Sequence, residues 1–193
     1  MKVQQLNDKE LILEYLKGND KSFEILLNRH RNKIYTSIYL FTKDPDLSED
    51  IFQDVFIKII DTLRKGKYNH EGKFLQWAMR IAYNMCVDNF RRSKRRTKVS
   101  ATETFDIFDV LESKDDNMET TMIKSQLHTK VRKLVDKLPP EQREVVILRH
   151  YADMSFKEIS QLTRVSINTA LGRMRYALIN MRKMANEVEL VAS

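Results

Sequence analysis

The chain has 193 residues, 42% of them hydrophobic, and a formal net charge of +7. This length allows one domain or two small ones with real cores, and the excess of positive charge indicates a polyanionic partner. A single cysteine, Cys86, excludes a disulfide framework, and we expect it to pack in the core of a protein from a reducing compartment. The start lacks the apolar region of a signal peptide, and no run approaches the roughly 18 apolar residues of a membrane span. The sequence therefore predicts a cytoplasmic protein without membrane insertion.

Few turn signals interrupt the chain, which has four glycines and three prolines. Long segments instead repeat apolar residues at three- and four-residue spacings, so we expect an all-α fold. A short helix is predicted at residues 8–17, where Gly18 ends it. A longer one should begin with Asp20 as its N-cap and continue to the break at Asp44 and Pro45.

A third helix is predicted at residues 46–65, because Asp46 and Glu49 have the spacing of a capping box. One face is apolar and is expected to be buried: Ile51, Phe52, Val55, Phe56, Ile59, Ile60 and Leu63. The opposite face is polar and mostly acidic: Glu49, Asp50, Gln53, Asp54 and Lys58. It is either the ordinary solvent side of an amphipathic helix or a docking surface for a basic helix of another protein.

The stretch from 73 to 98 holds the only tryptophan and the densest basic run, and it reads as one helix. Its predicted packing stripe consists of Phe74, Trp77, Ala78, Ile81, Ala82 and Met85. A place on this stripe favours a core role for Trp77 over stacking on an unpaired base. The preceding loop, 65–73, has three residues better exposed for stacking: Tyr68, Asn69 and His70.

A second face of the same helix carries polar residues on neighbouring turns: Arg80, Asn84, Asp88 and Arg91. The amide of Asn84 both donates and accepts, so it could read a base edge, although alone it is more often a surface residue. Six of the eight residues from 91 to 98 are Lys or Arg, among them Arg91, Arg92, Arg95 and Arg96. Like charge at this density opposes folding unless a polyanion relieves it, so we favour phosphate contact over a solvated helix end.

We place the first domain at residues 1–97 and a flexible linker at 98–123. From 99 to 123 the linker has seven acidic residues and one lysine. Its apolar residues, such as Phe105 and Phe108, either dock on a partner or pack within the molecule.

The second domain, 124–193, is predicted to contain a helix-turn-helix. A helix at 127–138 ends at two prolines, and Pro140 suits the first turn of the next helix, which runs to 152. Ser155 and Glu158 form a capping box, a three-residue turn covers 163–165, and a final helix spans about 166–184. Its packing side consists of Ile167, Ala170, Met174, Ala177, Leu178 and Met181. In this motif the second helix enters the major groove, and its candidate contacts are Asn168, Thr169, Leu171, Gly172, Arg173, Arg175 and Tyr176.

An enzyme is poorly supported by the sequence. The four histidines have no metal-ligand spacing with one another or with Cys86, and there is neither a glycine-rich phosphate loop nor a nucleophile elbow. We therefore expect no catalysis, no metal and no cofactor.

Three motifs in order resemble the extracytoplasmic-function (ECF) sigma factors, the small two-domain specificity subunits of bacterial RNA polymerase. LSEDIFQDVFIKI at 47–59 resembles the polymerase-binding segment of sigma domain two, and FLQWAMRIAYNMCVDNFRR at 74–92 resembles its promoter-reading helix. Residues 138–178 resemble sigma domain four. The resemblance spans nearly the whole chain, and the order of the three motifs makes it specific.

The resemblance implies that Glu49, Asp50, Gln53 and Asp54 bind the clamp helices of the largest subunit of core RNA polymerase. It implies that the first domain melts the minus-ten element, with Asn84, Asp88 and the 66–73 loop around a flipped-out base. The full minus-ten set is Tyr68, Asn69, His70, Arg80, Asn84, Asp88, Arg91, Arg92, Arg95 and Arg96. The linker would thread basic polymerase channels, and an anti-sigma factor would be a further partner.

The second domain would read the minus-thirty-five element. It departs from the family at Leu171, where a basic residue is usual, so another factor could help to place the protein on DNA. The alternative function is a stand-alone helix-turn-helix regulator that binds operator DNA without core polymerase. Binding to core polymerase separates the two hypotheses.

Overall fold

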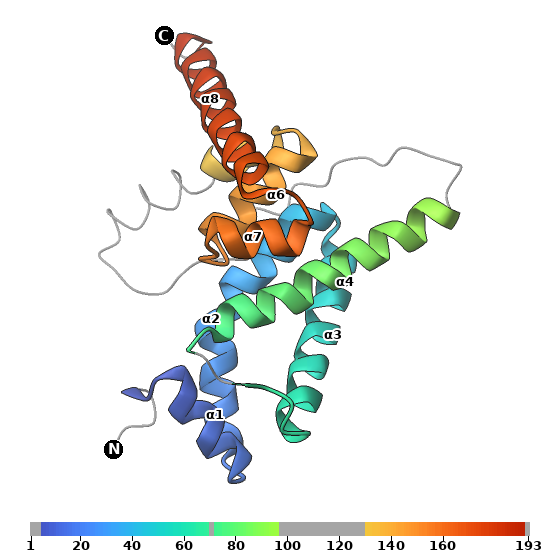
Figure 1. Ribbon diagram of the computed structural model, residues 1–193, viewed down its shortest axis with the longest axis vertical. Helices are drawn as coiled ribbons and strands as arrows, with labels where there is room; N and C mark the ends of the chain where they lie inside the picture. Colours follow the sequence, from blue (N-terminus) through green and yellow to red (C-terminus); the bar gives the residue numbers. More distant parts are fainter. Residues whose placement is uncertain (1–4, 70–71, 97–129, 192–193) are drawn as a thin grey trace. The chain divides into compact units, whose positions relative to one another are not determined.

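The computed structural model describes residues 5–69, 72–96 and 130–191, and within these ranges it contains helices and no strands (Figure 1). The helices form two compact units. The first contains α1 (Asp8–Leu16), α2 (Asp20–Thr42), α3 (Pro45–Arg64) and α4 (Phe74–Arg96). The second contains α6 (Pro140–His150), α7 (Phe156–Thr163) and α8 (Ile167–Val191), preceded by helical residues 130–136. The acidic segment predicted as a linker, 98–123, lies outside the described residues.

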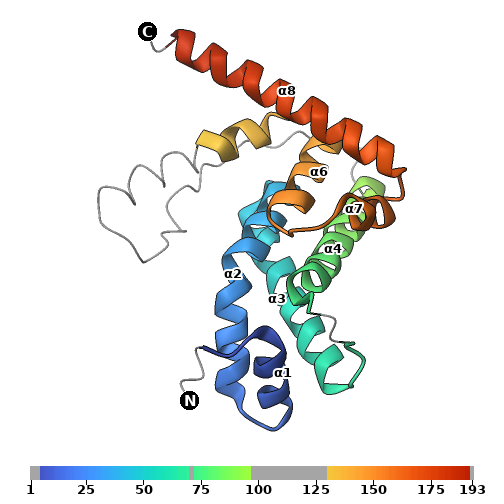
Figure 2. The same cartoon turned by 60° about the vertical axis from the view of Figure 1, so that its left-hand side comes forward.

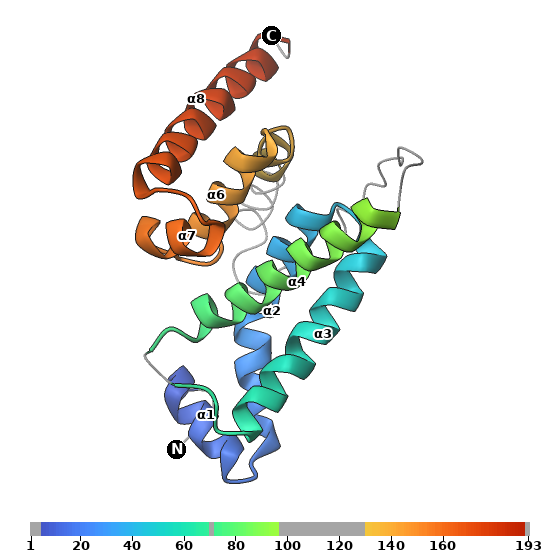
Figure 3. The same cartoon turned by 45° about the vertical axis from the view of Figure 1, so that its right-hand side comes forward.

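The first unit is organised around α2, which packs against α1, α3 and α4, while α3 and α4 also contact each other. Figures 1 and 3 show α4 crossing α2 and α3. The side chains at the centre of this unit are fully buried: Leu26, Ile34, Ile38, Val55, Ile59 and Ala78. Burying each large aliphatic side chain stabilises the fold by about 1.5–3 kcal/mol, so tertiary packing holds these helices together.

Two predicted helix starts in this unit were wrong by one or two residues. The N-cap of α3 is Asp44, whose carboxylate accepts a hydrogen bond from the Leu47 amide at 3.1 Å, and not Asp46. Pro45 explains the difference, because proline suits the first helical position, where its missing N–H costs nothing. Similarly, Asp20 is the first residue of α2 rather than its cap, which is Asn19.

The start of α1 is held against α2 by polar contacts. Asp8 Oδ1 accepts a hydrogen bond from Arg29 at 2.6 Å, and Asp8 Oδ2 lies 2.8 Å from His30 Nε2. Burial acts to raise the pKa of Asp8, but the hydrogen bonds with His30 and Arg29 outweigh it, so the pKa is lowered. The carboxylate is therefore ionised at neutral pH and fixes α1 in place.

The prediction that Cys86 packs in the core is confirmed, since the residue is buried in α4. Burial raises the pKa of its thiol to about 12. The side chain is thus a neutral packing group and not a nucleophile at physiological pH.

The second unit is built on α8, which packs against α6 and α7, as Figure 2 shows. Pro140 begins α6 as predicted. The side chains in the core of the unit are Val145, Ile147, Leu148, Ile159, Ala170 and Ala177. In α8, Ala170 and Ala177 are buried as predicted, but Ile167 and Leu178 are 45% and 42% exposed. Met174 and Met181 are half-buried, so the two alanines lie at the centre of the contact and the predicted packing side was too wide.

Candidate nucleic-acid and protein interfaces

The polar face of α3 lies opposite a stripe that is buried as predicted, except that Ile60 is half-buried. On the polar face Asp50, Gln53 and Asp54 are exposed and Glu49 is half-buried. Gln53 Nε2 donates to Glu49 Oε1 at 3.4 Å. Burial, together with the nearby carboxylates of Glu49 and Asp46, raises the pKa of Tyr35 despite the opposing effect of Arg31. With three carboxylates, Glu49, Asp50 and Asp54, against one lysine, Lys58, the face is net acidic on an otherwise basic protein.

Sequence reasoning missed Ile57, which is 63% exposed on this same face. It lies three residues after Asp54 and four after Gln53, so a helical projection of 46–65 would have revealed it. An exposed apolar side chain next to carboxylates gives this face the mixed character of a protein interface, with an apolar centre and a polar rim.

The buried side of α4 differs from the predicted stripe. Seven side chains are buried: Phe74, Leu75, Ala78, Met79, Ala82, Tyr83 and Cys86. Trp77, Ile81 and Met85, which we expected in the core, are only half-buried. Two stripes that share Phe74, Ala78 and Ala82 both satisfy helical periodicity, and the positions of α2 and α3 decide which of them is covered.

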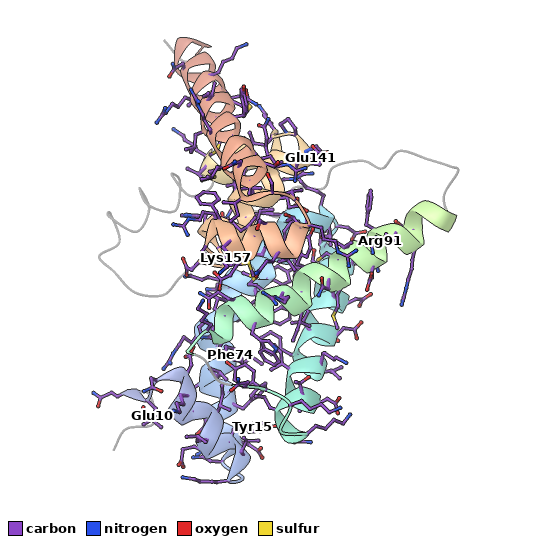
Figure 4. The ribbon with its side chains drawn as sticks, in the orientation of Figure 1. Glu10, Tyr15, Phe74, Arg91, Glu141 and Lys157 are labelled. Atoms are coloured by element: carbon purple, nitrogen blue, oxygen red, sulfur yellow. The ribbon has the colours of Figure 1, made fainter. Side chains whose placement is uncertain are left out.

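The outward side of α4 brings together the polar residues predicted to act there. Arg80, Asn84, Asp88 and Arg91 are all exposed, and their spacing places them on one face. Asp88 and Arg91 form an ion pair at 3.8 Å, with side chains 64% and 63% exposed, which stabilises the helix little. Figure 4 labels Arg91 near one end of α4 and Phe74 at the other.

Other members of the predicted minus-ten set are less completely defined. Arg92 is exposed and Asn69 is exposed in the loop before α4. Tyr68 is half-buried, with its ring centroid 4.3 Å from that of Trp77. His70 and the side chains of Arg95 and Arg96 lie outside what the structure describes.

The helix-turn-helix forms as predicted, except that the turn lies one residue later, at 164–166, between Thr163 at the end of α7 and Ile167 at the start of α8. Ser155 caps α7 in a reciprocal capping box with Glu158. Arg164 then adopts a left-handed conformation with φ of 59°, and the Ser166 hydroxyl accepts a hydrogen bond from the Thr169 amide at 3.0 Å. The final helix extends to Val191, beyond the predicted end at 184, because no glycine or proline follows to stop it.

The candidate contacts at the start of α8 differ in exposure. Five are exposed: Asn168, Thr169, Leu171, Arg175 and Tyr176. Gly172 and Arg173 are half-buried. Arg173 Nη1 lies 3.4 Å from Glu144 Oε2 of α6, and the two side chains are only 25% and 22% exposed. The ion pair between Arg173 and Glu144 thus joins α8 to α6. The sequence did not reveal this role of Glu144.

Within residues 5–69, 72–96 and 130–191, no three His, Cys, Asp or Glu side chains are arranged to hold a metal ion. None of the helices within the described part of the chain is long and apolar enough to cross a membrane.

The second unit contains a helix-turn-helix, and the first presents polar and basic residues on the outward face of α4. These two features together are typical of a DNA-binding protein. Comparison with known families narrows this class. The model of Sigma-70 region 2 matches residues 26–96 and the model of Sigma-70, region 4 matches 128–175, together more than half of the chain. The chain belongs to the ECF sigma factors of bacterial RNA polymerase.

Individual relatives agree with this assignment. The ECF RNA polymerase sigma factor SigW of Bacillus subtilis is 24% identical over 184 residues, which cover 93% of this chain and 97% of the relative. The ECF RNA polymerase sigma-E factor of Escherichia coli K12 is 26% identical over 175 residues, covering 88% and 90%. The chain is therefore a sigma factor, which binds core polymerase and promoter DNA, and not a stand-alone regulator. Sigma factors are not a family of enzymes.

Solved structures share the fold. CnrH, in complex with the cytosolic domain of CnrY, matches with a TM-score of 0.59 at 21% identity, covering 93% of this chain and 97% of that one. The sigma factor RpoE, in complex with the anti-sigma factor NepR from Bartonella quintana, matches with a TM-score of 0.64 at 16% identity, covering 86% and 98%. The predicted all-α fold with two sigma domains is confirmed.

Proposed function

We propose that the acidic face of α3 is the surface through which this sigma factor binds core RNA polymerase. Glu49, Asp50, Gln53 and Asp54 would contact the clamp helices of the largest subunit. The observation that carries this proposal is that the carboxylates of Asp50 and Asp54 and the side chain of Ile57 are exposed together on one face, in a chain of net charge +7. Charges at the rim of such an interface speed association with a basic partner, and an apolar centre slows dissociation.

The outward face of α4 and the loop before it are proposed to hold the melted minus-ten element. Asn84 and Asp88 would hold an unpaired base. Arg80 and Arg91 would contact the DNA backbone next to that base. Further phosphate contacts would come from Arg92, Arg95 and Arg96. The exposure of Arg80, Asn84 and Arg91 on one helix face supports this arrangement. Because the face would bind the unpaired strand, binding energy drives promoter opening and no catalytic step is needed.

The start of α8 is proposed to read the minus-thirty-five element in the major groove. Asn168, Thr169, Leu171, Arg175 and Tyr176 are exposed there. Arg173 would contribute chiefly by fixing α8 against α6 through Glu144. We also propose the domain boundaries 1–97, 98–123 and 124–193.

An anti-sigma factor is proposed as a regulatory partner, and the cytoplasm as the place of action. The two structural neighbours described above were both solved in complexes, one with the cytosolic domain of CnrY and the other with the anti-sigma factor NepR. Their likeness to this chain in fold supports, for this protein too, a partner that competes with core polymerase.

Charge reversal tests the polymerase-binding surface. The double variant Asp50→Lys, Asp54→Lys should raise the Kd for core polymerase by roughly 10- to 100-fold, since two carboxylates would become repulsive. A matched control is Asp20→Lys, Glu24→Lys, which reverses two exposed charges at the same spacing on α2. Affinities of the purified proteins for core polymerase provide the measurement. Equal weakening by both double variants would contradict the assignment to α3.

A further inference from the structure

Trp77 is half-buried and lies outside the buried side of α4. It shares a face of α4 with Asn84 and Asp88, which follow it by seven and eleven residues and are both exposed. The buried side of α4 passes instead through Leu75 and Met79. A large aromatic side chain is therefore placed on the proposed base-holding face, and its ring contacts those of Tyr68 and Phe74.

The loop between α3 and α4 supplies the nearer of these two rings, that of Tyr68. The end of α3 is closed by two hydrogen bonds, from the Lys67 amide to the Thr62 carbonyl at 3.1 Å and from the Gly66 amide to the Leu63 carbonyl at 3.0 Å. Gly66 takes a positive φ of 62°, which only glycine adopts at little cost. This turn ends α3 immediately before Tyr68.

Tyr68 packs its ring on two rings of α4. Its centroid is 4.3 Å from that of Trp77, with an angle of 45° between the rings, and 6.2 Å from that of Phe74, at 84°. The Phe74 ring is also 5.8 Å from Trp77. Aromatic contacts of this geometry are favourable beyond the area that they bury, so they hold the loop against α4.

The base of this cluster is itself fixed. Phe74 is only 1% exposed, and its ring centroid is 5.3 Å from that of His30 in α2. His30 in turn lies against Asp8 of α1 through the polar contact described above. The Tyr68 ring thus rests on a support to which α1, α2 and α4 all contribute.

We propose that Tyr68 and Trp77 are positioning residues that set the base preference of the minus-ten pocket. Their contact holds the loop on the first turns of α4, so that exposed Asn69, the next residue, is presented beside the face of Asn84 and Asp88. This inference rests on the proposed function of that face. A small displacement of a recognition group weakens discrimination between bases more than it weakens overall binding.

Three substitutions of Tyr68 test the proposal. Tyr68→Phe keeps the ring, Tyr68→Ala removes it, and Tyr68→Leu removes the ring but keeps apolar bulk in case the alanine variant folds poorly. Tyr35→Ala is the matched control, because Tyr35 is also half-buried and its ring packs on Phe52 with centroids 5.7 Å apart. Each variant is assembled with saturating core polymerase and bound to forked promoter DNA that carries each of the four bases in turn at every unpaired minus-ten position.

The quantity measured is the ratio of affinities for the preferred and the other bases, which a general loss of stability does not change. We expect Tyr68→Ala and Tyr68→Leu to reduce this ratio roughly tenfold, and Tyr68→Phe and Tyr35→Ala to leave it within about twofold. Since Trp77 is the only tryptophan, its fluorescence should also shift to longer wavelength when Tyr68 loses its ring and not in Tyr68→Phe.

Asn84→Ala separates this inference from the function on which it rests. If Asn84→Ala lowers the ratio while Tyr68→Ala and Tyr68→Leu do not, the positioning role is overturned and the base-holding face stands. If Asn84→Ala, Tyr68→Ala and Tyr68→Leu all leave the ratio unchanged, the proposed base-holding function of this face is wrong. A loss in the Tyr68 variants alone would support the positioning role and remove Asn84 from the pocket.

Discussion

The two long helices proposed to contact DNA, α4 and α8, present their side chains in different ways. On α4 the polar residues Arg80 and Asn84 are exposed, and the aromatic packing of the site lies beside them at Tyr68 and Trp77. On α8 the candidate Arg173 is mostly buried in an ion pair with Glu144. Substitutions on the outward face of α4 should therefore change DNA binding without loss of stability. A substitution at Arg173 should change DNA binding and also lower the stability of the second unit.

Removing Arg173 gives the largest expected effect on stability. Arg173→Ala should lower the stability of the second unit by about 2 kcal/mol, because it removes a partly buried ion pair that joins α8 to α6. Arg175→Ala, an exposed arginine two residues further on, should change stability by less than about 0.5 kcal/mol. Denaturant unfolding of both variants measures the difference.

A double-mutant cycle sharpens this result. If the ion pair is the cause, Glu144→Ala combined with Arg173→Ala should cost clearly less than the sum of the two single changes. Additive costs would show that Arg173 does not act through Glu144, and the contrast between α4 and α8 would then fail.

A smaller effect concerns the turns before α3 and before α8. Lys43 in the first unit and Arg164 in the second have positive φ angles of 60° and 59°. Lys43→Gly and Arg164→Gly should each stabilise their unit by up to about 1 kcal/mol, because glycine relieves the steric cost of this conformation. Thermal unfolding measures the change.

The control for these turns is Lys17→Gly, since Lys17 ends α1 with a φ of −82° and has no such strain to relieve. It should give no stabilisation. Destabilisation by all three glycine substitutions would mean that the freedom glycine adds to the unfolded chain outweighs the strain at Lys43 and Arg164.

Local signals in the sequence predicted local structure well. The capping box of Ser155 and Glu158 and the start of α6 at Pro140 formed as expected, because each depends on residues a few positions apart. The cap of α3 was wrong because two aspartates, Asp44 and Asp46, competed for one role and the proline between them decided it.

Features that depend on distant residues could not be predicted. The two possible stripes on α4 differ only in what α2 and α3 cover, so Trp77 was placed in the core. The Arg173–Glu144 pair joins residues 29 apart, and the Tyr68–Trp77 contact depends on a glycine turn that periodicity does not describe. The roles proposed for Asn84 and Asp88 came from the family resemblance, and the structure adds that both residues are exposed on one face of α4.

The central claim is that α4 acts on melted DNA and α8 on duplex DNA, and one paired measurement tests it most directly. Asn84→Ala and Arg175→Ala holoenzymes are compared for binding to duplex DNA carrying the upstream element and for open-complex formation on the whole promoter. Asn84→Ala should leave duplex binding within about twofold and reduce open-complex formation roughly tenfold, whereas Arg175→Ala should weaken duplex binding itself. Equal loss of duplex binding in the two variants would contradict the division of labour between the helices.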